Sequence, residues 1–369
     1  MRYLDDFRAK EPLQAVLDRI RSLPSRPLSI MEVCGTHTVS ISRFGLRSLL
    51  PPRIRLLSGP GCPVCVTSQE DIDRMILLAR EGRGQGKYII ATFGDMMRVP
   101  GTNSSLMKEK ARGADVRIVY SPADALTMAA ENPAAEVVFF AVGFETTSPT
   151  IAATVLTAQR SHIGNFSIIS NHKLIPPAMR LLLEDAATAI DGFLCPGHVS
   201  AIIGSKPYQA IVERYGTGCV VGGFEPFDIM LSVYRLMLQI QEGTPRVEIE
   251  YSRVVRAEGN ARALQLLSRV FDVTDARWRG FGIIPQSGLT LKDEFSRYDA
   301  VKKFGLTAPA VSDPAECRCG QVLKGIITPP ECPLFATRCS PEEPVGACMV
   351  SSEGTCAAYY KYEQRAPHH

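Results

Sequence analysis

The chain has 369 residues, of which 45% are apolar, and a formal net charge of +3. This length predicts two or three domains, and so weak a charge gives no reason to expect binding to nucleic acid or to a membrane surface. No apolar run reaches transmembrane length and the first residues do not resemble a signal peptide, so we expect a cytoplasmic protein. Eleven cysteines in that compartment favour metal binding or redox chemistry over structural disulfides.

From residue 25 to about 241, short apolar segments, Gly-bearing polar loops and helices alternate, after an expected amphipathic helix over 3–22. This alternation is typical of parallel α/β sheets, whose ligands bind outside the carboxyl ends of the strands. Several polar residues directly follow an expected strand, which makes them candidates for a site or for helix capping. They are Asp95, Glu145, His172, His198 and Glu225.

The predicted fold class is α/β, with two related parallel-sheet domains and a third, mostly irregular or helical domain. We expect the first α/β domain at 25–117 and the second at 118–241. The third is expected to combine 1–24 with 242–369. In the latter range the α/β alternation ends and the sequence becomes rich in Cys and Pro. Strand endings with Gly followed by an acid suggest that the two α/β halves are related.

A C-x-x-C pair, Cys62 and Cys65, lies in a loop stiffened by Gly and Pro. The segment 67–70 matches a capping box, so we expect a helix to begin directly after the pair. Unpaired N–H groups and the dipole at a helix N-terminus favour thiolate over thiol. Thiolate is both the nucleophile and the soft metal ligand, so this pair is a candidate redox or metal site.

Cys34 follows another expected strand and stands three residues before His37. The three thiols of Cys34, Cys62 and Cys65 allow three interpretations. They could be buried small hydrophobic residues, or ligands of a structural zinc ion with His37 as the fourth ligand. The interpretation we favour is a redox dithiol with a third thiol, which together hold a soft metal such as iron. His37 is then a candidate proton carrier or ligand, against a plain hydrogen-bonding role.

Four further cysteines lie within 25 residues near the end of the chain: Cys332, Cys339, Cys348 and Cys356. Four thiolates suit a 4Fe–4S cluster or a Cys₄ zinc site, and the spacing does not separate the two. Cys317 and Cys319 add two thiols, either of which could replace Cys348 as a ligand or act as a redox partner. Cys195 and Cys219 are expected in the core.

Five motifs in this order resemble the HypD family of hydrogenase maturation factors. They are Met31–His37 (MEVCGTH), Gly59–Cys65 (GPGCPVC), Gly143–Thr147 (GFETT), Pro196–Ser200 (PGHVS) and Met349–Cys356 (MVSSEGTC). The resemblance implies two α/β domains plus a third that holds a 4Fe–4S cluster. It implies a scaffold that works with HypC to build the Fe(CN)2CO unit of NiFe-hydrogenase, with cyanide from HypE, supplied by HypF.

The family's functional thiols correspond to Cys34, Cys62 and Cys65, with His37 beside the first and Glu353 in the Ser-Ser-Glu-Gly stretch. The hypothesis is that Cys34 and one or both other thiols hold iron. Thiolates are suitable ligands for low-potential iron. A C-x-x-C pair can exchange two electrons by closing to a disulfide, and a cluster passes one electron at a time.

On this hypothesis the chain is a redox-active assembly scaffold rather than a conventional turnover enzyme. One alternative is a 4Fe–4S-dependent thiol–disulfide reductase acting on a partner protein. This alternative gives the Cys34 motif no function. Another is a zinc-stabilised interaction module with no redox role.

Overall fold

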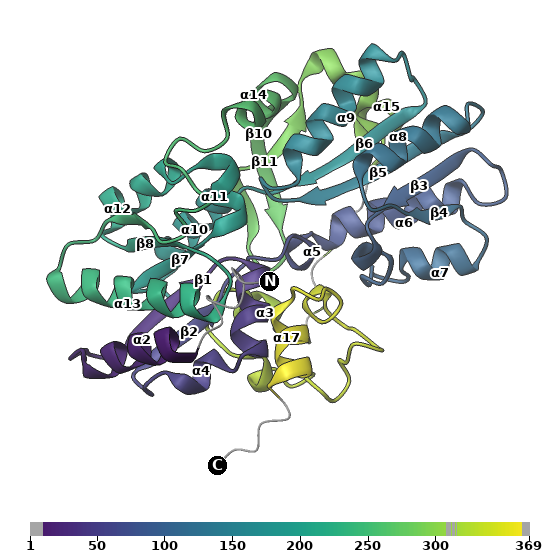
Figure 1. Ribbon diagram of the computed structural model, residues 1–369. Helices are drawn as coiled ribbons and strands as arrows, with labels where there is room; N and C mark the ends of the chain where they lie inside the picture. Colours follow the sequence, from purple (N-terminus) through teal and green to yellow (C-terminus); the bar gives the residue numbers. More distant parts are fainter. Residues whose placement is uncertain (1–9, 308–310, 312–313, 315, 364–369) are drawn as a thin grey trace.

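The computed structural model describes residues 10–307, 311, 314 and 316–363. Its chain forms two parallel sheets, an antiparallel hairpin and a C-terminal segment of short helices and turns (Figure 1). This architecture confirms the predicted α/β fold class. Within the described ranges, no helix is both long and apolar enough to cross a membrane.

The first sheet contains five parallel strands in the order β2-β1-β7-β8-β9. These are β1 (Leu28–Glu32), β2 (Ile54–Ser58), β7 (Gly192–Pro196), β8 (Gly218–Gly222) and β9 (Val247–Ile249). Every residue of β7 and β8 is buried, as expected where helices cover both faces of a parallel sheet. The accompanying helices are α2 (Lys10–Ser22), α3 (Gly35–Arg43), α4 (Leu46–Leu49), α11 (Gly197–Ile203), η2 (Lys206–Tyr208), α12 (Gln209–Tyr215) and α13 (Pro226–Glu242).

The second sheet has four parallel strands in the order β4-β3-β5-β6. These are β3 (Tyr88–Thr92), β4 (Val116–Ile118), β5 (Glu136–Gly143) and β6 (Phe166–His172). The helices of this part are α5 (Pro63–Val66), α6 (Gln69–Glu81), η1 (Gly94–Met97), α7 (Leu106–Ala111), α8 (Pro122–Glu131), α9 (Ser148–Arg160) and α10 (Ile175–Glu184).

The predicted division of the chain does not follow these sheets. We expected 25–117 and 118–241 to form separate α/β domains, yet β1 pairs with β7, and β3 pairs with β5. The chain leaves the first sheet after β2, builds the whole second sheet, and returns at β7. Each buried parallel strand is a short apolar run, and the sequence of such a run does not indicate which strand pairs with it.

An antiparallel hairpin, β10 (Phe271–Trp278) and β11 (Gly282–Leu291), follows α14 (Ala261–Val270). The sequence pattern did not predict this hairpin, which lies in the region where the α/β alternation ends. Its strand β11 packs against β6, and isolated bridges join Thr67 to Trp278 and Lys173 to Gly288. The hairpin therefore contacts both the second sheet and the segment that follows the C-x-x-C pair.

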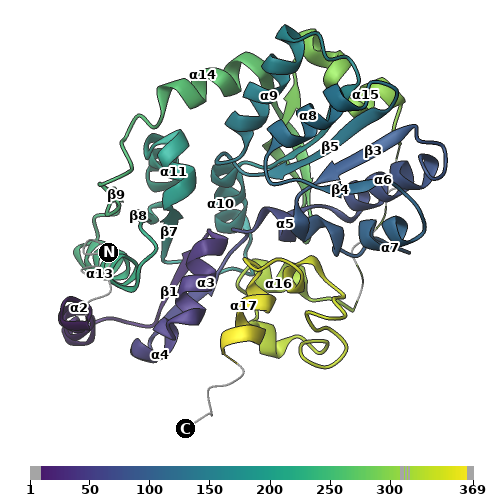
Figure 2. The ribbon, with the colours of Figure 1, turned by 45° about the vertical axis from the view of Figure 1, so that its right-hand side comes forward.

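The C-terminal segment from α16 onward lies beside α3 and beneath α5 in the view of Figure 2. Its short elements are α16 (Cys319–Leu323), η4 (Pro329–Glu331), η5 (Ala347–Met349) and α17 (Thr355–Tyr362), whereas the preceding η3 (Asp293–Tyr298) and α15 (Ala300–Phe304) pack against β6 of the second sheet. Helix α17 packs against α3, and η5 packs against α5. This segment thus joins the turn that carries Cys34 to the helix that carries the C-x-x-C pair.

Candidate functional site

Cys34 is the N-cap residue of α3, directly after the first sheet's strand β1. Its N–H donates to the buried carboxylate of Glu32 at 2.9 Å, and the Thr38 hydroxyl also donates to that carboxylate. Burial raises the pKa of the Cys34 thiol to about 12, although the N–H groups of His37 and Thr36 oppose the shift. The thiol is therefore protonated at neutral pH in the isolated chain, because desolvation outweighs the helix N-terminus.

Glu32 was not singled out from the sequence, although it stands within the first motif. It is fully buried, and burial raises its pKa to about 7, against hydrogen bonds from Thr38 and Cys34 that lower it. An acid at the end of an otherwise apolar strand was the only sequence feature that could have identified it. In the structure, its carboxyl group fixes the backbone of the turn that presents Cys34.

Cys62 and Cys65 form a disulfide, with their Cα atoms 5.3 Å apart. Cys62 is the N-cap of α5, a one-turn helix that the sequence did not predict, and its sulfur accepts the N–H of Cys65 at 3.2 Å. The expected capped helix follows as α6, whose N-cap Ser68 accepts the N–H of Asp71. The pair is therefore at a helix N-terminus, as predicted, but it begins a helix of its own.

The turn of Cys34 and the loop of Cys62 are in direct contact. The N–H of Gly35 donates to the carbonyl of Gly61 at 2.8 Å. A Cβ atom on Gly61 would lie 2.2 Å from the Cys34 nitrogen, so only glycine fits there. Two segments separated by more than twenty residues thus meet at the backbone of Cys34.

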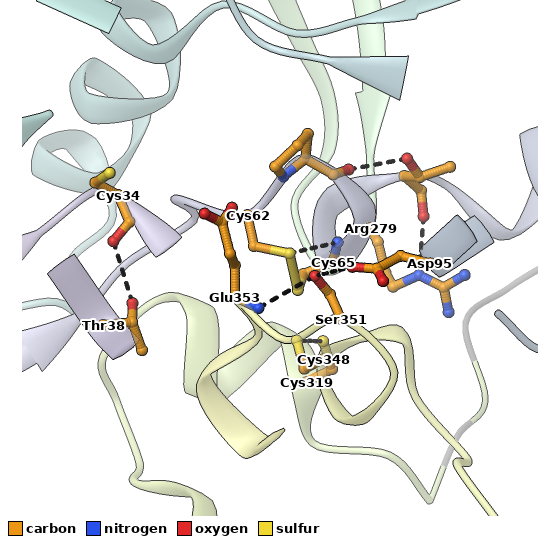
Figure 3. Close-up of a disulfide and its surroundings, with 12 residues drawn as sticks. Cys34, Thr38, Cys62, Cys65, Asp95, Arg279, Cys319, Cys348, Ser351 and Glu353 are labelled. Atoms are coloured by element: carbon orange, nitrogen blue, oxygen red, sulfur yellow. Dashed lines mark hydrogen bonds between the residues drawn. A yellow bond between two sulfur atoms is a disulfide. The ribbon is translucent and has the colours of Figure 1, made fainter. Parts of the chain in front are cut away.

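The three sulfurs are not arranged as a ready metal site. Figure 3 shows the Cys34 sulfur turned away from the disulfide, with the Glu353 carboxylate between them. Across the described ranges, no three His, Cys, Asp or Glu side chains have a geometry that could hold a metal ion. Joint ligation by Cys34, Cys62 and Cys65 stays a prediction, and it requires the disulfide to open and the Cys34 side chain to turn.

His37 is fully buried on the first turn of α3 and contacts the loop after β8. Its Nε2–H donates to the carbonyl of Gly223 at 2.8 Å, and its ring lies 4.9 Å from that of Phe224, on which His198 stacks at 4.0 Å. Burial lowers the pKa of His37 to about 4, so the ring is neutral. Its Nδ1 is buried and has no hydrogen-bond partner within the described part of the chain, which leaves one lone pair available in this interior.

Glu353 connects the C-terminal segment to the Cys34 turn. Its carboxylate accepts the Thr36 hydroxyl at 2.9 Å, and its N–H donates to Ser351, whose hydroxyl donates to Asp95 at 2.9 Å. Burial raises the pKa of Glu353. Asp95, a candidate from its place after a strand, thus contacts the C-terminal segment.

The other polar residues that follow strands do not gather at the thiols. Glu145 is buried and accepts the N–H of Ile175 at 3.0 Å, at the start of α10. Glu225 caps α13 through a capping box with Asp228. His172 lies at a separate cavity beside the hairpin. Capping, the plainer of the two roles considered, therefore describes Glu225.

All six C-terminal cysteines line one small cavity, whose other walls are mainly apolar: Cys317, Cys319, Cys332, Cys339, Cys348 and Cys356. The sulfurs of Cys319 and Cys348 are 2.8 Å apart. Hydrogen bonds from the thiols of Cys317 and Cys348 lower the pKa of Cys319. Thiolates are the donors that iron–sulfur clusters use, and the four predicted ligands share this space with both spare thiols.

The C-x-x-C pair and this cysteine cavity are neighbours, because α5 packs against η5, which contains Cys348. Arg279 at the hairpin turn reinforces the junction: its N–H donates to Val66 and its side chain donates to Thr67, both at 2.9 Å. The charge of Arg279 also contributes to the lowered pKa of Cys319. Cys195 and Cys219 are fully buried in the first sheet, as expected of core residues.

These observations define a class: an α/β protein with two parallel sheets in which a C-x-x-C loop touches both a third cysteine and a cysteine-lined cavity. A family model named HypD, with the description "Hydrogenase formation hypA family", matches residues 11–363. The chain belongs to the HypD family.

Individual relatives match over almost their whole lengths. Hydrogenase maturation factor HypD2 of Bradyrhizobium diazoefficiens is 45% identical over 100% of this chain and 98% of its own. Hydrogenase maturation factor HypD of Escherichia coli is 45% identical over 99% of both chains. The protein of that name from Cupriavidus necator is 43% identical over 98% of this chain and 97% of its own.

Proposed function

We propose that this chain is a scaffold for hydrogenase maturation that binds iron through Cys34 and one or both of Cys62 and Cys65. On that iron, together with HypC, it assembles the Fe(CN)2CO unit. The observation that carries this proposal is the backbone contact between the Cys34 turn and the C-x-x-C loop at Gly61. With the backbones in contact, side-chain rotation and opening of the disulfide are the changes needed to bring three sulfurs toward one ion.

The chemistry of these side chains suits iron as the substrate. Reduction of the Cys62–Cys65 disulfide takes up two electrons and two protons and yields two thiols. Iron then displaces the proton of each thiol that binds it, including the Cys34 proton held by the raised pKa. Thiolates donate electron density to iron, and an electron-rich iron binds cyanide and carbon monoxide, which are π-acceptors.

The cysteine cavity is proposed as the seat of a 4Fe–4S cluster. Cys332, Cys339, Cys348 and Cys356 would hold it, with Cys317 or Cys319 able to replace Cys348. When bound, such a cluster supplies electrons one at a time. The packing of η5 on α5 places the Cys348 segment against the C-x-x-C helix. The backbone thus provides a short route between the two sets of thiols.

The proposed partners are HypC, in a stable complex, and HypE, which delivers cyanide that HypF supplies. The proposed compartment is the cytoplasm, since nine of the eleven cysteines are free and a reducing compartment keeps thiols in that state.

Infrared spectroscopy of the complex with HypC, isolated without oxygen, tests the scaffold. The wild-type complex is expected to show CN and CO bands, and Cys34→Ala is expected to lose them. Cys219→Ala is the matched control, because Cys219 is also buried but lies in the sheet core. Bands of normal intensity in folded Cys34→Ala protein would overturn the assignment of Cys34.

A second candidate is a cluster-dependent thiol–disulfide reductase, favoured by the disulfide that lies against the η5 segment. A reductase needs Cys62 and Cys65 but not Cys34. Disulfide exchange with a partner protein that is unchanged in Cys34→Ala, in a complex without CN or CO bands, would support it.

A zinc-stabilised module without redox chemistry is separated by metal and sulfide analysis of protein purified without oxygen. Zinc without sulfide would support that alternative, and iron with sulfide would exclude it.

A further inference from the structure

A cavity of about 570 Å3 lies beside the hairpin, apart from the thiols. Its walls come from the N-terminus of α6, the end of β6, both hairpin strands and the start of α15. This volume falls within the range of pockets that bind small molecules, and most of the lining residues carry polar or charged side chains. The proposed assembly function does not use this cavity.

Lys173 is the distinctive residue of the cavity wall. It directly follows β6 and is only 4% exposed, yet its ammonium group makes no hydrogen bond or ion pair with any residue that the structure describes. Its backbone is fixed, because its N–H donates to the carbonyl of Gly143 and it bridges to Gly288. Burial lowers the pKa of Lys173, and the charge of Asp71 opposes that shift only in part, while the charge of Arg74 adds to it.

The other charged residues of the wall are already paired. Asp71 accepts the Ser68 hydroxyl at 2.7 Å and pairs with Arg74, and Glu70 pairs with Arg74 and Arg277. The remaining pairs are Asp275 with the N–H of Gln286, Asp299 with the N–H of Val301, and Lys302 with Asp293. Lys173 is therefore the charged group of the wall that is left to meet a ligand.

Neutral donors lie in the same wall. Thr274 and Thr290 belong to adjacent hairpin strands, and their half-buried hydroxyls have no hydrogen-bond partner among the described residues. Ser170 differs, because its hydroxyl donates to the carbonyl of Leu289 and therefore accepts from His172 Nδ1. Two hydroxyl donors and one ammonium are a donor set for an oxygen anion.

We propose that this cavity binds a small molecule through a carboxylate or phosphate group, which pairs with the Lys173 ammonium and accepts hydrogen bonds from Thr274 and Thr290. The ligand's anion supplies the partner that the buried ammonium lacks. Of the wall carboxylates, Asp71 acts on Lys173 through its charge but pairs directly with Arg74, so a ligand anion can still take the direct contact with the ammonium.

Trp278 gives a direct readout, because it is the one tryptophan in the sequence and follows Arg277 of the cavity wall. Its fluorescence is measured in the full-length protein while inorganic phosphate or acetate is added at constant ionic strength, with chloride as the balancing anion. We expect a saturable change with at least one of the two anions, and the one that binds identifies the class of ligand. A change that chloride reproduces would overturn the proposal.

The substitutions Lys173→Met and Lys302→Met form a matched pair, since both lysines line the cavity but Lys302 is exposed and paired with Asp293. Lys173→Met is expected to weaken anion binding by about tenfold or more, and Lys302→Met by less than about twofold. Lys173→Arg keeps the positive charge and is expected to bind the anion. Binding by this variant would show that a loss in Lys173→Met comes from the missing charge and not from misfolding. Unchanged binding in Lys173→Met would contradict the proposal, as would loss of binding in Lys302→Met alone.

Discussion

The hydroxyl of Thr36 donates to the carboxylate of Glu353 at 2.9 Å, across 317 residues of chain. This bond joins the first turn of α3, which begins at Cys34, to the C-terminal segment that carries the cysteine cavity. A Cβ atom on Gly35 would lie 2.5 Å from that of Glu353, so the two segments are in contact along their backbones as well. The C-terminal segment is thus part of the wall around Cys34.

Removal of the Glu353 side chain is expected to loosen this junction. Glu353→Ala leaves the half-buried Thr36 hydroxyl without its acceptor, and we expect a loss of about 1 kcal/mol in the free energy of unfolding. Glu353→Gln keeps an oxygen acceptor and is expected to lose less. Urea denaturation of both variants measures the difference, and equal stability of Glu353→Ala and wild type would show that the bond does not hold the segments together.

Close packing at Gly61 gives a second prediction. Gly61→Ala forces the Cys34 turn and the C-x-x-C loop apart, since the new methyl group overlaps the Cys34 backbone. We expect a loss of about 1–3 kcal/mol or more in stability, with weaker iron binding by the complex with HypC. Thermal unfolding and iron analysis measure these two effects.

Gly94→Ala is the control for Gly61→Ala, because the nearest atom to its new methyl group is 3.8 Å away on Ile118. Its stability is expected to stay within about 0.5 kcal/mol of wild type. Equal behaviour of the two alanine variants would refute the claim that the loops meet tightly at Gly61.

Glu145 gives a prediction for pH. Burial raises its pKa from 4.5 to about 7, so the folded protein holds this proton over a range in which the unfolded chain has lost it. Its contribution to stability is therefore complete below pH 4.5 and is lost as the pH rises to about 7. The full effect is about 3 kcal/mol as an upper bound.

Glu145→Gln is expected to flatten this part of the stability profile and to be more stable than wild type at pH 7. The amide can still accept the N–H of Ile175, so the capping bond is kept. Urea denaturation at several pH values between 4.5 and 7 measures the slope. Parallel profiles for the two proteins would show that Glu145 does not titrate in this range.

The cysteine cavity yields a prediction on folding. If its thiols hold a cluster, Cys339→Ala is expected to disorder the C-terminal segment, because metal ligation there replaces an extensive apolar core. Limited proteolysis, visible absorption and the melting temperature measure this effect. An unchanged melting temperature with an intact cluster spectrum would remove Cys339 from the ligand set.

The sequence predicts the positions of the helices and strands better than it predicts which strands pair with one another. The capping pattern at 67–70 places the start of α6 to within one residue, since the N-cap is Ser68. The assignment of β1 and β7 to one sheet depends on tertiary packing, which leaves no pattern in either run. The hairpin was missed because one face of it is open to solvent, so that Val273 and Ile283 are exposed and the alternation of its strands is weak.

For the site, motifs identify the thiols but not their environment. The sequence suggests that a helix N-terminus activates a thiol, whereas the raised pKa of Cys34 comes from burial that only the fold creates. The bonds that the Cys34 N–H donates to Glu32 and the Thr36 hydroxyl donates to Glu353 likewise depend on where the fold places these side chains.

The central claim is that Cys34, with the opened C-x-x-C pair, binds an iron ion separate from the cluster. Iron and sulfide analysis of the reduced complex with HypC, prepared without oxygen, tests it most directly when wild type is compared with Cys34→Ala. We expect the variant to lose one iron per chain while its sulfide content stays unchanged. Equal iron content in the two complexes would contradict the claim.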